Sequence, residues 1–129
     1  MSPAVGIVLV AHSARLADAL AELAGELTGG GVPVEAAGGT EDGGTGTSIE
    51  KVERALRSAD LGAGVVVLAD LGSSVLTVKT LLEDDPLRAV LADAPFVEGA
   101  LAAVMTAATG GDRAAVLTAA EEARGFRKL

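Results

Sequence analysis

Residues 5–20 read VGIVLVAHSARLADAL, and this stretch decides the fold class. Residues 5–10 are an unbroken aliphatic run, the pattern of a strand that is covered on both faces of a parallel sheet. After Ser13 the apolar period becomes that of a helix, because leucines recur at intervals of four, three and four residues, at Leu16, Leu20, Leu23 and Leu27. These leucines form one face of an amphipathic helix, the face that normally packs on the core. A buried strand followed at once by such a helix predicts an α/β fold.

The rest of the chain continues this alternation. The patterns predict, in order, a strand at 32–38, a glycine-rich loop at 38–48, a helix at about 49–59, a strand at 64–70, a turn and helix at 71–85, a strand at 88–95, and helices at 97–110 and 112–124. The stretch RAVLADAP at 88–95 is ambiguous, and we interpret it as a strand because Pro95 and a turn follow. We therefore expect one domain over residues 1–129, with an open, mostly parallel sheet and helices on both faces.

Composition excludes several classes of function. The 129 residues include no Cys, Trp or Tyr and only two Phe, which removes thiol chemistry, cysteine zinc sites and aromatic platforms for stacking bases. The net charge of −8 repels phosphodiester backbones and anionic membranes, so neither nucleic acid nor a membrane is an expected partner. No apolar run reaches the roughly 18 residues of a membrane span, and no basic leader precedes the first one. We expect a cytoplasmic protein.

Polar residues follow three of the expected strands at the point where each strand ends. Ligands of open parallel sheets bind beyond this carboxyl edge, where loops lead into helices. The residues gathered there are His12 and Ser13 after the first strand, Thr40, Thr47 and Ser48 after the second, and Asp70, Gly72, Ser73 and Ser74 after the third. His12 is the only histidine in the chain. The convergence of an imidazole, a carboxylate, hydroxyls and glycine-backed amides is more informative than any one residue.

This set of groups fits transfer of a phosphoryl group. Helix N-termini and glycine-rich turns bind phosphate through backbone N–H groups. A neutral imidazole is a nucleophile at pH 7, and a carboxylate on one ring nitrogen leaves the lone pair of the other free to attack. We interpret His12 as the phosphoryl acceptor, Asp70 as the group that orients it, and the hydroxyls as donors to the phosphoryl oxygens. With one obvious carboxylate, no metal site is expected.

Structural interpretations of the same residues stay open. Asp70, Ser73 and Ser74 are also ordinary helix caps, and the loop at 38–48 also fits a surface turn. Residues 47–50, Thr-Ser-Ile-Glu, have the spacing of a capping box, which predicts that Thr47 caps the following helix.

The stretches VAHS, AAGGTEDGGTGTS, ADLGSS and APFVEGA, in this order, resemble the DhaM family. Its members are phosphotransferase subunits of the dihydroxyacetone kinase that draws on the phosphoenolpyruvate-dependent phosphotransferase system (PTS), and their domain is similar to mannose-type enzyme IIA (EIIA). The resemblance implies a single such domain over 1–129, a four-stranded sheet of order 2-1-3-4, and a homodimer. It also implies that Asp70 lies beside the histidine and that the turn at 72–74 lies near the phosphoryl group.

The resemblance further implies a relay. His12 would take a phosphoryl group from the phosphocarrier HPr and pass it to ADP on the partner subunit DhaL, whose ATP then phosphorylates dihydroxyacetone on DhaK. Any ADP, ATP and magnesium would belong to DhaL, with no cofactor in this chain, and analogy favours Nε2 as the phosphorylated atom. Thr40, Thr47 and Ser48 match the family loop by sequence.

Three rival interpretations belong to other classes of protein. An aspartyl-phosphate receiver would use Asp70, although receivers need a pair of acids where this chain has His12 and Ser13. A tetrapyrrole chelatase would need further histidines. A binder of phosphorylated metabolites would use the same anion-binding loops without a covalent step.

Overall fold

The structure is a computed structural model that describes residues 3–84 and 89–129. Its sheet has four parallel strands in the order β2-β1-β3-β4, with bounds β1 Gly6–Ala11, β2 Val34–Gly38, β3 Val65–Ala69 and β4 Ala89–Leu91. The helices are α1 Ala14–Thr28, α2 Ile49–Ala59, α3 Gly72–Asp84, α4 Phe96–Ala108 and α5 Arg113–Glu122, followed by a 3-10 turn at Ala123–Gly125. The predicted fold class and strand order are confirmed. Residue 85 of the expected third helix and residue 88 of the expected fourth strand lie outside the described residues.

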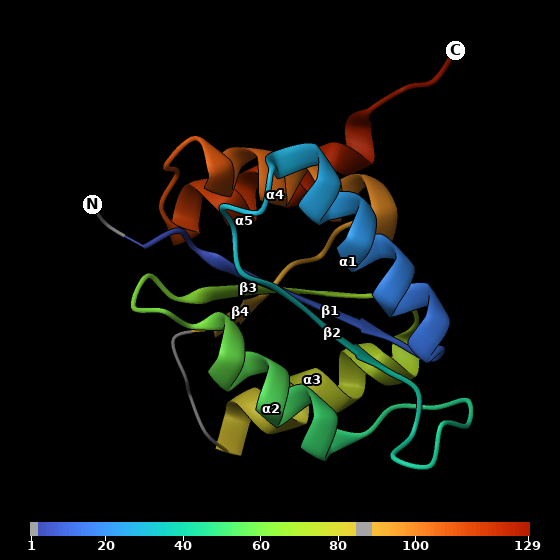
Figure 1. Ribbon diagram of the computed structural model, residues 1–129. Helices are drawn as coiled ribbons and strands as arrows, with labels where there is room; N and C mark the ends of the chain where they lie inside the picture. Colours follow the sequence, from blue (N-terminus) through green and yellow to red (C-terminus); the bar gives the residue numbers. More distant parts are fainter. Residues whose placement is uncertain (1–2, 85–88) are drawn as a thin grey trace.

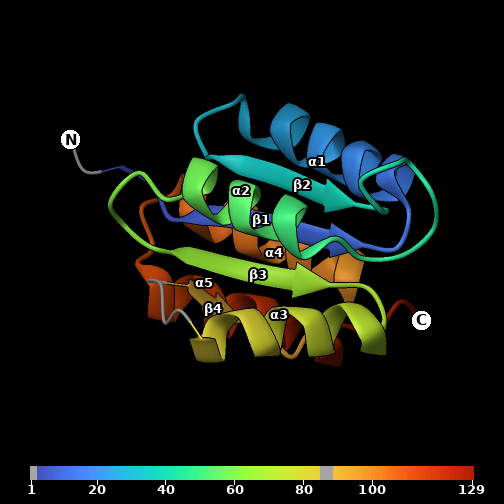
Figure 2. The same cartoon turned by 90° about the horizontal axis from the view of Figure 1, so that it is seen from below.

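The sheet is covered on both faces. Helices α1, α4 and α5 lie on one face and α2 and α3 on the other (Figure 1, and Figure 2 from below). All six residues of β1 are buried, which accounts for the aliphatic run in the sequence. Val10 of β1 is in register with Ala37 of β2 and Ala69 of β3, so these three strands end side by side.

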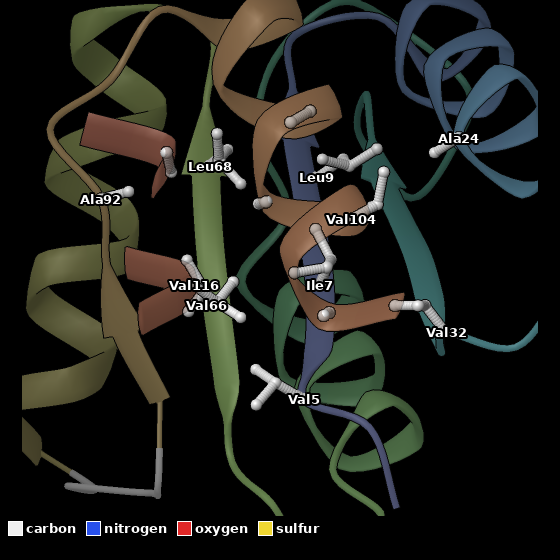
Figure 3. Close-up of a cluster of buried hydrophobic side chains, with 14 of the residues drawn as sticks. Val5, Ile7, Leu9, Ala24, Val32, Val66, Leu68, Ala92, Val104 and Val116 are labelled. Atoms are coloured by element: carbon white, nitrogen blue, oxygen red, sulfur yellow. The ribbon is translucent and has the colours of Figure 1, made fainter. Parts of the chain in front are cut away.

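Alternate residues of the strands supply two separate cores. Ile7 and Leu9 point into the core under α1, α4 and α5, which Figure 3 shows together with Val66, Leu68 and Val104. Val8 and Val10 point into the core under α2 and α3. Helices cover both faces of the sheet, and ligands of such sheets bind beyond the carboxyl ends of the strands, where the polar groups of this chain lie.

The buried face of α1 differs from the predicted one. Its buried residues are Ala17, Leu20 and Ala24, while three of the four leucines of the predicted face are exposed, with 43% of Leu16, 41% of Leu23 and 52% of Leu27 accessible. The expectation that all four leucines pack on the core was wrong.

The physical reason lies in how closely α1 approaches β2. A Cβ atom added at Gly38 would lie 2.9 Å from Cβ of Ala17 and 2.5 Å from the carbonyl oxygen of Ser13. Only small side chains fit at such a contact, so alanines form most of the buried face and the leucines lie along its flank.

Within residues 3–84 and 89–129, no helix combines the length and the apolar character needed to cross a membrane.

Candidate functional site

His12 and Asp70 meet because β1 and β3 are neighbours that run in the same direction. Each residue directly follows its strand, and the backbone N–H of Asp70 donates to the carbonyl of Val10 at 3.1 Å. Oδ1 of Asp70 lies 3.0 Å from Nδ1 of His12, and Oδ2 accepts the backbone N–H of His12 at 3.0 Å. The carboxylate therefore holds both the ring and the backbone of the histidine.

Asp70 is ionised and fixes the tautomer of the ring. Burial raises the pKa of Asp70, but hydrogen bonds from the His12 amide, the His12 ring and the Leu71 amide together hold it below the ordinary 3.8. An ionised carboxylate only accepts hydrogen bonds, so Nδ1 carries the proton and Nε2 presents its lone pair. The His12 side chain is 20% exposed and that of Asp70 10%, so the ring is reachable while its partner is shielded.

The first turn of α3 supplies two hydroxyls to the ring. The hydroxyl of Ser73 contacts Nε2 of His12. Ser74 is fully buried, and its Oγ lies 3.2 Å from Nδ1 of His12 and 2.9 Å from Oγ1 of Thr47. Gly72 is exposed at the start of the helix, where backbone N–H groups lack helical acceptors. The reachable nitrogen thus lies at a helix N-terminus, a favourable place for an anion.

The glycine-rich loop closes on the histidine through its backbone. The N–H of Gly46 donates to the carbonyl of His12 at 2.9 Å, and Gly39 forms a parallel bridge with Thr47. Thr40 acts inside the loop, since its hydroxyl contacts the Asp42 carboxylate and accepts the N–H of Gly44 at 2.9 Å. The structure brings Thr47 to the ring through Ser74 and gives Thr40 partners within its own loop.

Two of the predicted phosphoryl-binding hydroxyls are helix caps. Oγ of Ser13 accepts the Leu16 N–H at 3.3 Å to cap α1, and Oγ of Ser48 accepts the Lys51 N–H at 3.1 Å to cap α2. The prediction that Thr47 caps α2 was wrong by one residue. Because Thr47 is held in the bridge with Gly39, the helix begins after Ser48.

Two basic residues of α2 support the loop and were missed by the sequence reasoning. Nζ of Lys51 donates to the carbonyl of Gly38 at 2.9 Å, and Arg54 pairs with Glu41 at 3.0 Å. The sequence contains a signal for this role. Basic residues in the first turns of a helix that follows an acidic loop suggest that the helix holds the loop in place.

The sequence matches the family described as "PTS system fructose IIA component", EIIA-man, over residues 6–117. This span contains His12, Asp70 and the whole glycine-rich loop. The chain belongs to the EIIA-man family.

Relatives within this family are named as DhaM subunits, so the resemblance predicted from the motifs is confirmed. "PEP-dependent dihydroxyacetone kinase 2, phosphoryl donor subunit DhaM" of Listeria innocua is 32% identical over 117 residues, which cover 88% of this chain and 94% of that protein. The DhaM subunit of Escherichia coli K12 is 36% identical over 115 residues, which cover 84% of this chain. The match spans only 24% of the E. coli protein, about a quarter of its length.

Two solved structures share the EIIA-man fold of this chain. The crystal structure of EF1359, a protein of unknown function, superposes with a TM-score of 0.83 at 31% identity and covers 95% of this chain and 96% of its own. A sigma-54 interaction domain protein from Enterococcus faecalis superposes with a TM-score of 0.73 and covers 97% of this chain and 93% of its own. At 18% identity, the second comparison supports the fold alone.

Proposed function

We propose that this EIIA-man chain is the phosphoryl donor subunit of a PEP-dependent dihydroxyacetone kinase, carrying the phosphoryl group on Nε2 of His12. One observation supports this most strongly: Nδ1 is bonded to the ionised Asp70 at 3.0 Å, which leaves Nε2 with its lone pair at the N-terminus of α3. The names of the DhaM relatives supply the reaction class.

The proposed chemistry is two displacements at one nitrogen. In the first, the Nε2 lone pair attacks the phosphorus of a phosphohistidine on the donor protein, and the donor N–P bond breaks with its electron pair returning to the donor ring. The proton on Nδ1 stays hydrogen-bonded to Asp70, which stabilises the positive charge that the ring acquires. In the second, a terminal oxygen of ADP attacks the same phosphorus, the Nε2–P bond breaks, and ATP forms. Phosphoryl transfer of this kind depends on positioning and electrostatics.

The proposed partners are HPr as donor and DhaL, with its bound ADP and magnesium, as acceptor, and through DhaL the DhaK subunit. His12 is the only covalent carrier in this proposal, so the chain needs no cofactor of its own. The net charge of −8 favours encounter with a basic docking face on a carrier protein. A cytoplasmic location belongs to the same proposal, because HPr and DhaL would have to reach His12.

A homodimer is also part of the proposal, and the exposed leucines of α1 indicate a face for it. Helices α1 and α4 pack side by side on one face of the sheet (Figure 1). We define the α1–α4 strip as their accessible large apolar residues, which are Leu16, Leu23 and Leu27 of α1 and Val97 and Met105 of α4, each 41–52% exposed. Large apolar surface on neighbouring helices marks interaction sites, so we take these residues as the candidate subunit contact.

The strip suits a second copy with the two α1 helices antiparallel. Arg15 lies at the start of α1 and Glu26 near its end, and neither has an ion pair within residues 3–84 and 89–129. A twofold axis near the middle of α1 would bring each Arg15 toward the Glu26 of the other copy.

Sedimentation should show a species of about 25 kDa, twice the chain mass of 12.7 kDa. Leu23→Glu should give monomers, while Leu61→Glu, at an exposed leucine outside the strip, should not. A wild-type chain that sediments as a monomer at all concentrations would exclude the homodimer.

Phosphorylation with enzyme I, HPr and phosphoenolpyruvate tests the central proposal. The chain should gain one phosphate that is labile in acid and stable in base, and peptide mapping should place it on His12. His12→Gln should fold, as judged by circular dichroism, and remain unlabelled. A phosphate on Asp70 would favour the receiver interpretation, and failure of the wild-type chain to label with an active HPr would favour non-covalent binding.

A further inference from the structure

We infer that Thr47 is a positioning residue that acts on His12 through the buried hydroxyl of Ser74, so that the glycine-rich loop helps to set the tautomer of the ring. This goes beyond the proposed function, which needs only His12 and Asp70. The sequence pattern predicted a different role, with Thr47 as a helix cap and a ligand of the phosphoryl group.

The inference begins with the protons around Ser74. Its Oγ is fully buried and lies 2.9 Å from Oγ1 of Thr47 and 3.2 Å from Nδ1 of His12. Nδ1 carries the ring proton, so toward the ring Oγ of Ser74 can only accept, and its own single proton is left for Thr47. Thr47 is therefore the acceptor in the contact between the two hydroxyls.

The resulting chain of hydrogen bonds has one direction. Nδ1 of His12 donates to Asp70 at 3.0 Å and, at the longer distance of 3.2 Å, to Ser74, and Ser74 in turn donates to Thr47. Hydrogen bonds in series strengthen one another in a shielded site. By accepting the Ser74 proton, Thr47 keeps the lone pairs of the Ser74 oxygen toward Nδ1, so that Ser74 supports Asp70 in holding the ring proton on that nitrogen.

Thr47 is held in place by the loop itself. It forms the parallel bridge with Gly39, and its neighbours Gly46 and Ser48 are bonded to the His12 carbonyl and to the first turn of α2. The position of the loop backbone therefore affects the His12 ring through the hydroxyl of Thr47. This accounts for a half-buried threonine whose side chain points at α3 although the helix that follows it is capped by Ser48.

The test is a double-mutant cycle with Thr47→Val, which keeps the shape of the side chain and removes its hydroxyl, and Ser74→Ala. The first readout is the fraction of the His12 ring that carries its proton on Nδ1, measured by ¹⁵N NMR on the unphosphorylated protein near pH 8. The second is the rate of phosphorylation by phospho-HPr. Thr47→Val should lower the Nδ1–H fraction and slow phosphorylation about three- to tenfold, the effect of one ordinary hydrogen bond.

The two substitutions should not add. If Thr47 acts through Ser74, Thr47→Val should have no further effect in the Ser74→Ala background. Thr47→Ser, which restores the hydroxyl, should recover the wild-type tautomer and rate. Thr45→Val changes an exposed threonine of the same loop and should leave both readouts unchanged. The apparent affinity for phospho-HPr should stay constant, because Thr47 is not expected to touch the donor.

Three results would overturn the inference. These are an unchanged tautomer in Thr47→Val, additive effects in the double variant, or failure of Thr47→Ser to rescue. Additive effects on rate alone would indicate that Thr47 contacts the phosphoryl group directly. If Thr47→Val unfolds, the comparison of Thr47→Ser with Ser74→Ala keeps the test, because a relay requires wild-type behaviour in the first and an altered tautomer in the second. The tautomer is read without phosphate, so this inference can fail or stand independently of the proposed function.

Discussion

Replacing Asp70 with asparagine examines the site directly, because it keeps the shape of the side chain and removes one of two acceptor oxygens. Oδ1 accepts from Nδ1 of His12 at 3.0 Å and from the Leu71 N–H at 2.8 Å, while Oδ2 accepts the His12 backbone N–H at 3.0 Å. An amide offers one oxygen and one NH₂ group. In either orientation, at least one N–H donor would therefore face the NH₂ group.

Both orientations of the asparagine weaken the nucleophile. With NH₂ toward the ring, Nδ1 of His12 must present its lone pair, so the proton moves to Nε2 and the attacking lone pair is lost. With NH₂ toward the backbone N–H of His12, the turn between β1 and α1 must shift. A hydrogen bond to a charged group contributes about 1.5–3 kcal/mol. Since 1.4 kcal/mol corresponds to a factor of ten, we expect phosphorylation of Asp70→Asn to slow roughly 10- to 100-fold.

Rapid-quench labelling from phospho-HPr measures this rate, and ¹⁵N NMR of the ring reports the tautomer. Asp18→Asn, at an exposed carboxylate of α1, is the matched control for loss of one negative charge and should label at the wild-type rate. The reasoning would be refuted if Asp70→Asn labelled within twofold of wild type while keeping its proton on Nδ1.

Three further predictions concern stability. Because hydrogen bonds hold the pKa of Asp70 below 3.8, the stability that they contribute is complete above about pH 4 and is lost as the pH falls through the lowered pKa. The difference in unfolding free energy between wild type and Asp70→Asn, measured in urea, should therefore be smaller at pH 3 than at pH 7. Gly38→Ala should lower the unfolding free energy by about 1–3 kcal/mol, because the added Cβ meets backbone atoms of Ser13 and Ala14. Gly25→Ala, with open space around its Cβ, should raise it by about 0.5–1 kcal/mol. Ser48→Ala should cost about 1 kcal/mol through loss of the α2 cap, and no such loss in a thermal melt would contradict the cap assignment.

The fold and the pair at the centre of the site follow from patterns that local physics makes reliable. A strand buried on both faces has to be apolar along its length, which is why residues 5–10 and 64–69 could be recognised as strands. Parallel strands end at one edge, so the residues that follow two neighbouring strands must meet. That argument alone brings His12 to Asp70, and the structure has their side chains 3.0 Å apart.

The roles of the hydroxyls could not be predicted, because a serine or threonine serves as a cap, a loop contact or a ligand with the same chemistry. Adjacent Thr47 and Ser48 both fit an N-cap, and Glu50 made Thr47 fit the capping box. The choice is made by a contact distant in sequence, the bridge to Gly39, which holds Thr47 in extended backbone and moves the start of the helix. No pattern of neighbouring residues contains that information.

The prediction of the buried face of α1 fails for a related reason, and the error indicates where a second protein surface would bind. Helical patterns are recognised by large apolar residues, but the closeness of two elements is set by their small ones. At Gly38 the backbone of β2 approaches α1 so nearly that only a small residue, Ala17, fits opposite it. Ala24 is buried on the same helix, and Leu16, Leu23 and Leu27 are exposed. Leucines that do not fill their own core, yet keep a helical period, are the residues expected to be covered by a second protein surface. The leucines that the pattern assigned to the core, and that the structure leaves exposed, therefore identify the α1–α4 strip as the surface to test for a second copy.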